Sequence, residues 1–128
     1  MVIFKRLFQL PALLLLLSGC AGLDQDPTRS WSAERFYTEG KTALNEGNYT
    51  TAIKHFETLE ARYPYGPYAE QAQLEVAYAY YKDNEPASAI AAANRFIRLH
   101  PTHPNTDYAY YLKGLANFND KPNLLERL

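Results

Sequence analysis

Residues 62–67 read RYPYGP, and 37 positions later residues 99–104 read LHPTHP, with two prolines at the same places in both. Small and apolar residues return at the same spacing: Gly40, Ala77 and Gly114; Ala52 and Ala89; Ile53 and Ile90. So many matches at one period, prolines among them, indicate a chain built from internal repeats of 37 residues.

The pattern between the prolines is helical. Phe36, Gly40 and Ala43 recur every three or four positions, as residues do along one face of an α-helix. Asn48 is a candidate N-cap, and a proline after a helical stretch stops the helix or occupies the first turn of the next one. The sequence therefore predicts five helices, near residues 32–46, 49–62, 67–82, 86–99 and 104–119, with Pro67, Pro86 and Pro104 as first-turn residues.

Paired helices with small residues at their contacts resemble the tetratricopeptide repeat. The resemblance is carried by Phe36, Gly40, Tyr49, Ala52, Phe56 and Pro64 in the first copy, by Ala77, Tyr80, Ala89, Phe96 and Pro101 in the second, and by Tyr110 and Gly114 in the third. It implies an all-α superhelix of helix–turn–helix repeats, truncated after the first helix of the third repeat. The period exceeds the usual 34 residues, and Ala93 stands where the family prefers a larger side chain.

The end of the sequence suggests a longer parent protein. A solenoid needs a polar capping element at each end, whereas Leu124, Leu125 and Leu128 are apolar. We therefore expect a fragment whose last helix exposes a face that a further helix would cover.

The first twenty residues resemble a bacterial lipoprotein signal. Lys5 and Arg6 precede an apolar run over residues 7–17, which is too short to span a membrane. The run ends in Leu17-Ser18-Gly19-Cys20, which resembles the lipobox. The alternative for the run is a buried core helix.

The lipobox resemblance implies diacylglycerol on the Cys20 sulfur, cleavage before Cys20 and acylation of the new amine. We thus expect a signal peptide over 1–19, the lipidated cysteine and a tether over 20–30, and a partial repeat domain over 31–128. Ala21 rather than aspartate follows the cysteine, which by resemblance to sorting rules implies the outer membrane. The covalent lipid is the only attached group expected, with no cofactor.

Two longer stretches carry a closer resemblance. ARYPYGPYAEQAQLEVAYAYYK (61–82) and ANRFIRLHPTHPNTDYAYYLKGL (93–115) resemble the BamD (ComL/YfiO) family, lipoproteins of the outer-membrane β-barrel assembly machinery. The resemblance implies a periplasm-facing scaffold that binds unfolded barrel precursors. It also implies assembly with BamA and the other BAM lipoproteins, mainly through carboxy-terminal repeats that this chain lacks. The alternative is a pilotin-like tetratricopeptide-repeat lipoprotein for secretin assembly, which should lack the YPYGPY and HPTHPN turns.

Eleven tyrosines supply the candidate binding surface. On the first helix of each repeat, one stripe should face the partner helix: Phe36, Gly40 and Ala43; Ala77 and Tyr80; Tyr110, Gly114 and Asn117. The neighbouring stripe should line the concave side, where solenoids bind partners. With the turn at 63–68, the candidate peptide-binding residues are Tyr37, Tyr63, Tyr65, Tyr68, Leu74, Tyr78, Tyr81, Tyr108, Tyr111 and Phe118, joined by Leu44 and Leu115. For any single tyrosine, packing between repeats remains the alternative.

Other chemistry has little support in the sequence. A net charge of −1 indicates no general attraction to nucleic acid, and one cysteine allows no internal disulfide. His100 and His103 have only Asp107 nearby, so no metal site is predicted. No nucleophile elbow, phosphate loop or HExxH motif is present, so no enzyme is expected. Charged residues such as Glu75 and Lys82 are interpreted as a solvated helix face.

Overall fold

The computed structural model describes residues 26–120 and contains only α-helices and turns within that range. The chain divides into two units at Ser30 and Trp31. In the first, the described residues 26–30 form a turn. The second holds the helices α3 (Ala33–Asn45), α4 (Tyr49–Arg62), α5 (Pro67–Lys82), α6 (Pro86–Leu99) and α7 (Thr106–Asp120).

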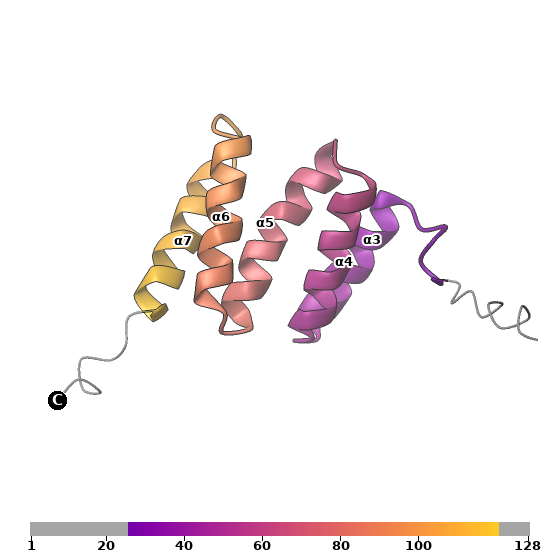
Figure 1. Ribbon diagram of the computed structural model, residues 1–128, viewed down its shortest axis with the longest axis horizontal. Helices are drawn as coiled ribbons and strands as arrows, with labels where there is room; N and C mark the ends of the chain where they lie inside the picture. The colour runs from indigo at the N-terminus through magenta and orange to yellow at the C-terminus, as the bar shows by residue number, and fades with distance from the viewer. Residues whose placement is uncertain (1–25, 121–128) are drawn as a thin grey trace, which may run out of the picture. The chain divides into compact units, whose positions relative to one another are not determined.

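Successive helices pack side by side and alternate in direction (Figure 1). In addition, α3 contacts α5 and α5 contacts α7, so the first helix of one repeat touches the first helix of the next. The predicted all-α array of helix–turn–helix repeats is therefore confirmed for the described residues.

Local signals explain most helix boundaries. The Ser32 hydroxyl accepts a hydrogen bond from the backbone N–H of Arg35, and Asn48 Oδ1 accepts one from the N–H of Thr51. These are the expected N-cap contacts. Pro67 and Pro86 occupy the first turns of α5 and α6, as predicted.

The last helix begins later than predicted, at Thr106 and not at Pro104. The Thr106 hydroxyl donates to the backbone carbonyl of His100 at 2.7 Å, and the N–H of Asn105 donates to His103 Nδ1 at 3.1 Å. Because these bonds hold residues 100–105 in a turn, Pro104 lies before the helix.

In the core of the first repeat, a residue without a side chain faces a large ring. Gly40 has no side chain, and the ring of the fully buried Phe56 fills the space beside it. One period later the corresponding residues, Ala77 and Ala93, are both small and fully buried. Because position 93 carries no ring, position 77 can hold an alanine where the first repeat has a glycine.

A second core cluster joins the last three helices. Phe96 of α6 is fully buried with Leu74 of α5 and Ala109 of α7. Leu74, like Leu44 in the main cluster, is almost fully buried, so both belong to the core as much as to the predicted binding wall.

The predicted partner-facing stripe of α7 is exposed. Tyr110 has 57% of its surface exposed, Gly114 and Asn117 are exposed as well, and nothing lies within 4 Å of a Cβ placed on Gly114. Instead, Ala109, Leu112 and Ala116 are the buried residues of this helix. A partner for the predicted stripe would come from outside the described residues.

Candidate functional site

A groove of about 770 Å³ lies along the first helices of the repeats. Five of the predicted wall residues line it: Tyr37 and Leu44 of α3, Leu74 and Tyr78 of α5, and Tyr108 of α7. Tyr49 of α4 adds a further ring. Because α3, α5 and α7 are one repeat apart, equivalent faces of these helices meet in one surface.

The groove contains one fixed polar centre. Lys41 Nζ donates to Glu75 Oε1 at 2.8 Å, and the Tyr37 hydroxyl donates to the same oxygen at 3.3 Å. The Glu75 side chain is mostly buried, and the pair joins α3 to α5. This carboxylate therefore fixes the orientation of a cation and a phenol in the wall of the groove.

Burial and, after it, the charge and hydrogen bond of Glu75 together raise the pKa of Tyr37 to about 12. The pKa of Tyr108 is also raised, first by burial and then by Glu75, Tyr78 and Tyr111. Both phenols therefore stay neutral near pH 7 and can donate hydrogen bonds. The arrangement suits binding by ring contact and hydrogen bonding.

Replacing Glu75 with glutamine should lower the pKa of Tyr37 but leave it above 10, because burial is the larger cause. The measurement is a titration of ring ¹³C signals in tyrosine-labelled protein, with Tyr37→Phe assigning the resonance. Tyr80 is the internal control, since burial and its bond to Glu57 raise its pKa to about 12 independently of Glu75. An unchanged Tyr37 titration would contradict the assigned contact.

The same shift sets a pH dependence of stability. The unfolded chain loses the Tyr37 proton near pH 10 and the folded chain near pH 12. The unfolded state therefore binds fewer protons between these values. The contribution of Tyr37 is fully present below pH 10 and is lost as the pH rises toward 12.

Two predicted residues lie at the edges of the groove. The Tyr68 ring is 5.7 Å from that of Tyr37, and the Tyr111 ring is 6.2 Å from that of Tyr108. Each ring centroid distance is within the range of aromatic pairing, so these two rings extend the wall outward.

Besides Tyr68 and Tyr111, five predicted residues are not among those that line the groove: Tyr63, Tyr65, Tyr81, Leu115 and Phe118. Tyr63 donates its hydroxyl to the backbone carbonyl of Trp31 at 2.7 Å, and Tyr65 is 91% exposed. Tyr81 is half-buried near the end of α5, and Phe118 on α7 is 78% exposed. The rings of Tyr63, Tyr65 and Tyr68 thus lie in separate surroundings.

Sequence reasoning missed the polar part of this groove. Its polar lining consists of Lys41, Asn45, Gln71, Glu75, Lys82 and Asn105. Interpreting Glu75 as solvated is wrong, because it is mostly buried against Lys41. Helical spacing could have indicated these residues. Lys41 follows Tyr37 by four residues and Glu75 precedes Tyr78 by three, so each lies on the same helix face as a predicted wall tyrosine.

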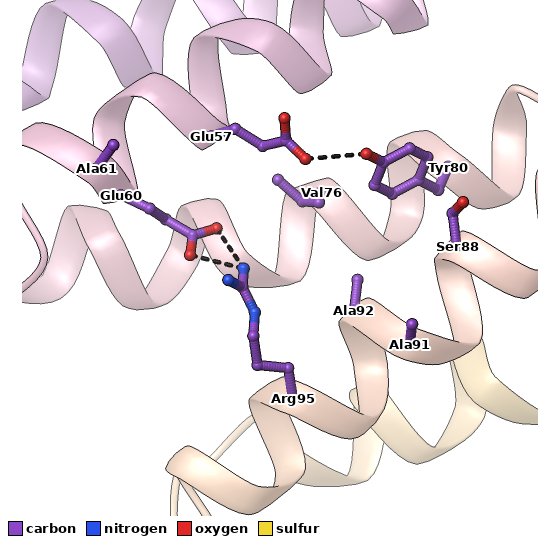
Figure 2. Close-up of a pocket in the computed structure, with 9 residues that line it drawn as sticks. All are labelled: Glu57, Glu60, Ala61, Val76, Tyr80, Ser88, Ala91, Ala92 and Arg95. Carbon is purple, nitrogen blue, oxygen red and sulfur yellow. Dashed lines mark hydrogen bonds and ion pairs between the residues drawn. The ribbon is translucent and has the colours of Figure 1, made fainter.

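A second groove, of about 590 Å³, lies between α4, α5 and α6 (Figure 2). Arg95 Nη2 donates to both carboxylate oxygens of Glu60, at 2.8 and 2.6 Å, and Tyr80 donates to Glu57 at 2.9 Å. Its charged groups are thus paired across the groove, and Tyr80 is its one aromatic ring. We therefore assign the candidate site to the tyrosine-walled groove.

Residues 26–120 lack two further features. No helix there has the length and apolar character needed to cross a membrane. Nor do His, Cys, Asp or Glu side chains gather there in groups of three or more that could bind a metal ion. The predicted signal peptide and Cys20 lie outside the described residues.

Comparison with known proteins gives a consistent picture. The model of the YfiO family, described as outer membrane lipoprotein, matches residues 29–127. The outer membrane protein assembly factor BamD of Neisseria meningitidis serogroup B is 48% identical over 129 residues, covering 97% of this chain and 48% of the relative. BamD of Vibrio cholerae is 40% identical over 115 residues, covering 90% of this chain and 47% of the relative. The chain spans about half the length of these relatives.

Proposed function

Because the chain belongs to the YfiO (BamD) family of outer membrane lipoproteins, we propose that it serves outer-membrane protein assembly as a scaffold that binds unfolded barrel precursors. The tyrosine-walled groove is the proposed binding surface. Tyr37, Leu74, Tyr78 and Tyr108 line the centre of this surface, and Tyr68 and Tyr111 lie at its edges.

One observation carries this proposal: four phenol rings from three repeats line a single groove beside unburied amide groups. An extended chain places alternate side chains on one face and leaves its backbone polar groups without partners. Tyrosine rings offer contact area with only two torsions to restrict, and their hydroxyls can bond the backbone. Gln71, Asn45 and Asn105 supply further donors and acceptors.

The anchor and the partners belong to the same proposal. Cys20 would hold the diacylglycerol and N-acyl chains, which would keep the repeats at the periplasmic face of the outer membrane. BamA and the other BAM lipoproteins are the proposed assembly partners. The relatives' name, assembly factor, supports this role and not the pilotin alternative. The same name fits a non-catalytic scaffold, and neither nucleic acid nor a cofactor is proposed.

Replacing Tyr78 with alanine should weaken binding of a precursor's carboxy-terminal peptide about tenfold, the loss expected when a central aromatic contact is removed. Fluorescence anisotropy of a labelled peptide with the full chain measures it. Tyr110→Ala is the matched control, because Tyr110 is exposed and does not line the groove.

A photo-crosslinking amino acid at positions 78 and 110 gives an independent readout. The proposal expects adducts with the peptide at position 78 and few at 110. Equal adducts at both positions, or unchanged affinity in Tyr78→Ala, would remove the groove as the binding surface.

A further inference from the structure

An aromatic edge lies at one end of the helical unit, outside both grooves. We use this name for Trp31, Tyr63 and Tyr65. Trp31 precedes α3, and the two tyrosines lie in the turn between α4 and α5, at the same end of the unit (Figure 1). The hydrogen bond from Tyr63 to the Trp31 carbonyl joins the two segments.

One cationic side chain lies over a ring of this edge and another over the neighbouring Phe36. The Arg35 guanidinium lies 4.6 Å from the centroid of the Trp31 ring, and that of Arg62 lies 5.1 Å from the centroid of Phe36. Acidic groups are close as well, since Glu39 is 4.0 Å from Arg35. The local charge is therefore mixed, and attraction to a partner must come mainly from the rings.

The chemistry of the edge is that of a membrane interface. Tryptophan and tyrosine have an apolar body and a polar tip, and they concentrate at the level of lipid headgroups. Arginine can extend its charge from such a site toward phosphates. Tyr65, 91% exposed, is the most exposed of the large hydrophobic side chains among residues 26–120.

The covalent sequence brings this edge near a bilayer. Ten residues lie between Cys20 and Trp31, so these two residues are at most about 40 Å apart when the chain is extended and about 20 Å apart as a flexible coil. Tethering converts a second contact into an intramolecular one at high effective concentration, so even a weak contact forms.

We propose that the aromatic edge enters the headgroup layer of the membrane as a second contact beside the acylated cysteine, and thereby sets the orientation of the repeats over the bilayer. This inference rests on the proposed lipid anchor. It gives Tyr63 and Tyr65 a lipid partner in place of the peptide predicted for them from sequence.

Trp31 is the only tryptophan in the chain, so its fluorescence reports on this edge alone. The full lipidated chain is reconstituted in phosphatidylethanolamine–phosphatidylglycerol vesicles that contain lipids nitroxide-labelled at the headgroup or deep in the acyl chain. We expect strong quenching by the headgroup label and weak quenching by the deep label. Tyr65→Ser should reduce headgroup quenching about twofold, whereas Tyr110→Ser, a change at an exposed tyrosine of α7, should not.

Flotation of the vesicles separates the two proposals. Protein that floats while Trp31 remains unquenched overturns the aromatic edge and leaves the anchor intact. Protein that does not float overturns the lipid anchor and the edge with it. If Tyr65→Ser weakens binding of the precursor peptide and leaves quenching unchanged, the edge is part of the peptide surface and the membrane proposal is wrong.

Discussion

Replacing Phe96 with alanine should lower the free energy of unfolding by about 3–5 kcal/mol, the usual cost of removing a buried aromatic ring. Phe96 is fully buried and packs with Leu74 of α5 and Ala109 of α7. Its ring centroid is 5.0 Å from that of His100 and 5.3 Å from that of His103. One ring thus holds three helices and the turn between the last two, and its loss leaves a cavity that none of them can fill alone.

Urea denaturation of the full chain, followed by circular dichroism, measures this loss. Leu99→Ala is the matched control on the same helix: Leu99 is 58% exposed, so a change within about 0.5 kcal/mol is expected. The free energy of unfolding of a whole domain is only about 5–15 kcal/mol, so the alanine variant can fail to fold. In that case Phe96→Leu, which should lose less stability, is measured instead. Equal losses at positions 96 and 99 would contradict the assigned core.

The helix boundaries were predictable where a single residue decides them. Asn48, Pro67 and Pro86 act through their own backbone or side-chain chemistry, so α4, α5 and α6 begin where the sequence predicts. The start of α7 depends on bonds made by Thr106 and His103 to neighbours in the folded turn. The sequence shows that Pro104 is compatible with the first turn of a helix, but it does not show the hydrogen bonds that start the helix two residues later.

The groove was predictable to the extent that it follows the repeat period. Tyr37 and Tyr78 belong to equivalent stripes of neighbouring repeats, and the structure brings them into one wall. The bond between Lys41 and Glu75 joins residues 34 positions apart. It depends on the register between α3 and α5, which no local pattern specifies. The directions of Tyr63 and Tyr65 were likewise not predictable, because a turn has no fixed periodicity.

Two glycines at equivalent repeat positions should respond to alanine in opposite ways. A Cβ at position 40 would lie 2.6 Å from Phe56 Cε1 and 2.9 Å from two further ring carbons. Phe56 is fully buried, so its ring has no room to move away. Gly40→Ala should therefore cost about 1–3 kcal/mol by overpacking, in spite of the better helix propensity of alanine.

Gly114→Ala is the control, because nothing lies within 4 Å of the added Cβ. It should stabilise the chain by about 0.5–1 kcal/mol, the usual gain of alanine over glycine inside a helix. Urea denaturation of the two variants measures the change in the free energy of unfolding, which should be a loss for Gly40→Ala and a gain for Gly114→Ala. Stabilisation by both substitutions would mean that Phe56 does not press against Gly40.

A double-mutant cycle identifies the ring as the cause. In Gly40→Ala/Phe56→Leu, the smaller side chain makes room for the new methyl group. The double variant should therefore lose less unfolding free energy than the two single variants lose together. The second repeat already combines an alanine at the glycine position with a small facing residue, since Ala77 and Ala93 are both buried. Strict additivity would place the strain elsewhere in α3. Coupling would show that the Phe56 ring is what requires a glycine at position 40, whereas the second repeat, with Ala93 in place of a ring, accepts an alanine at position 77.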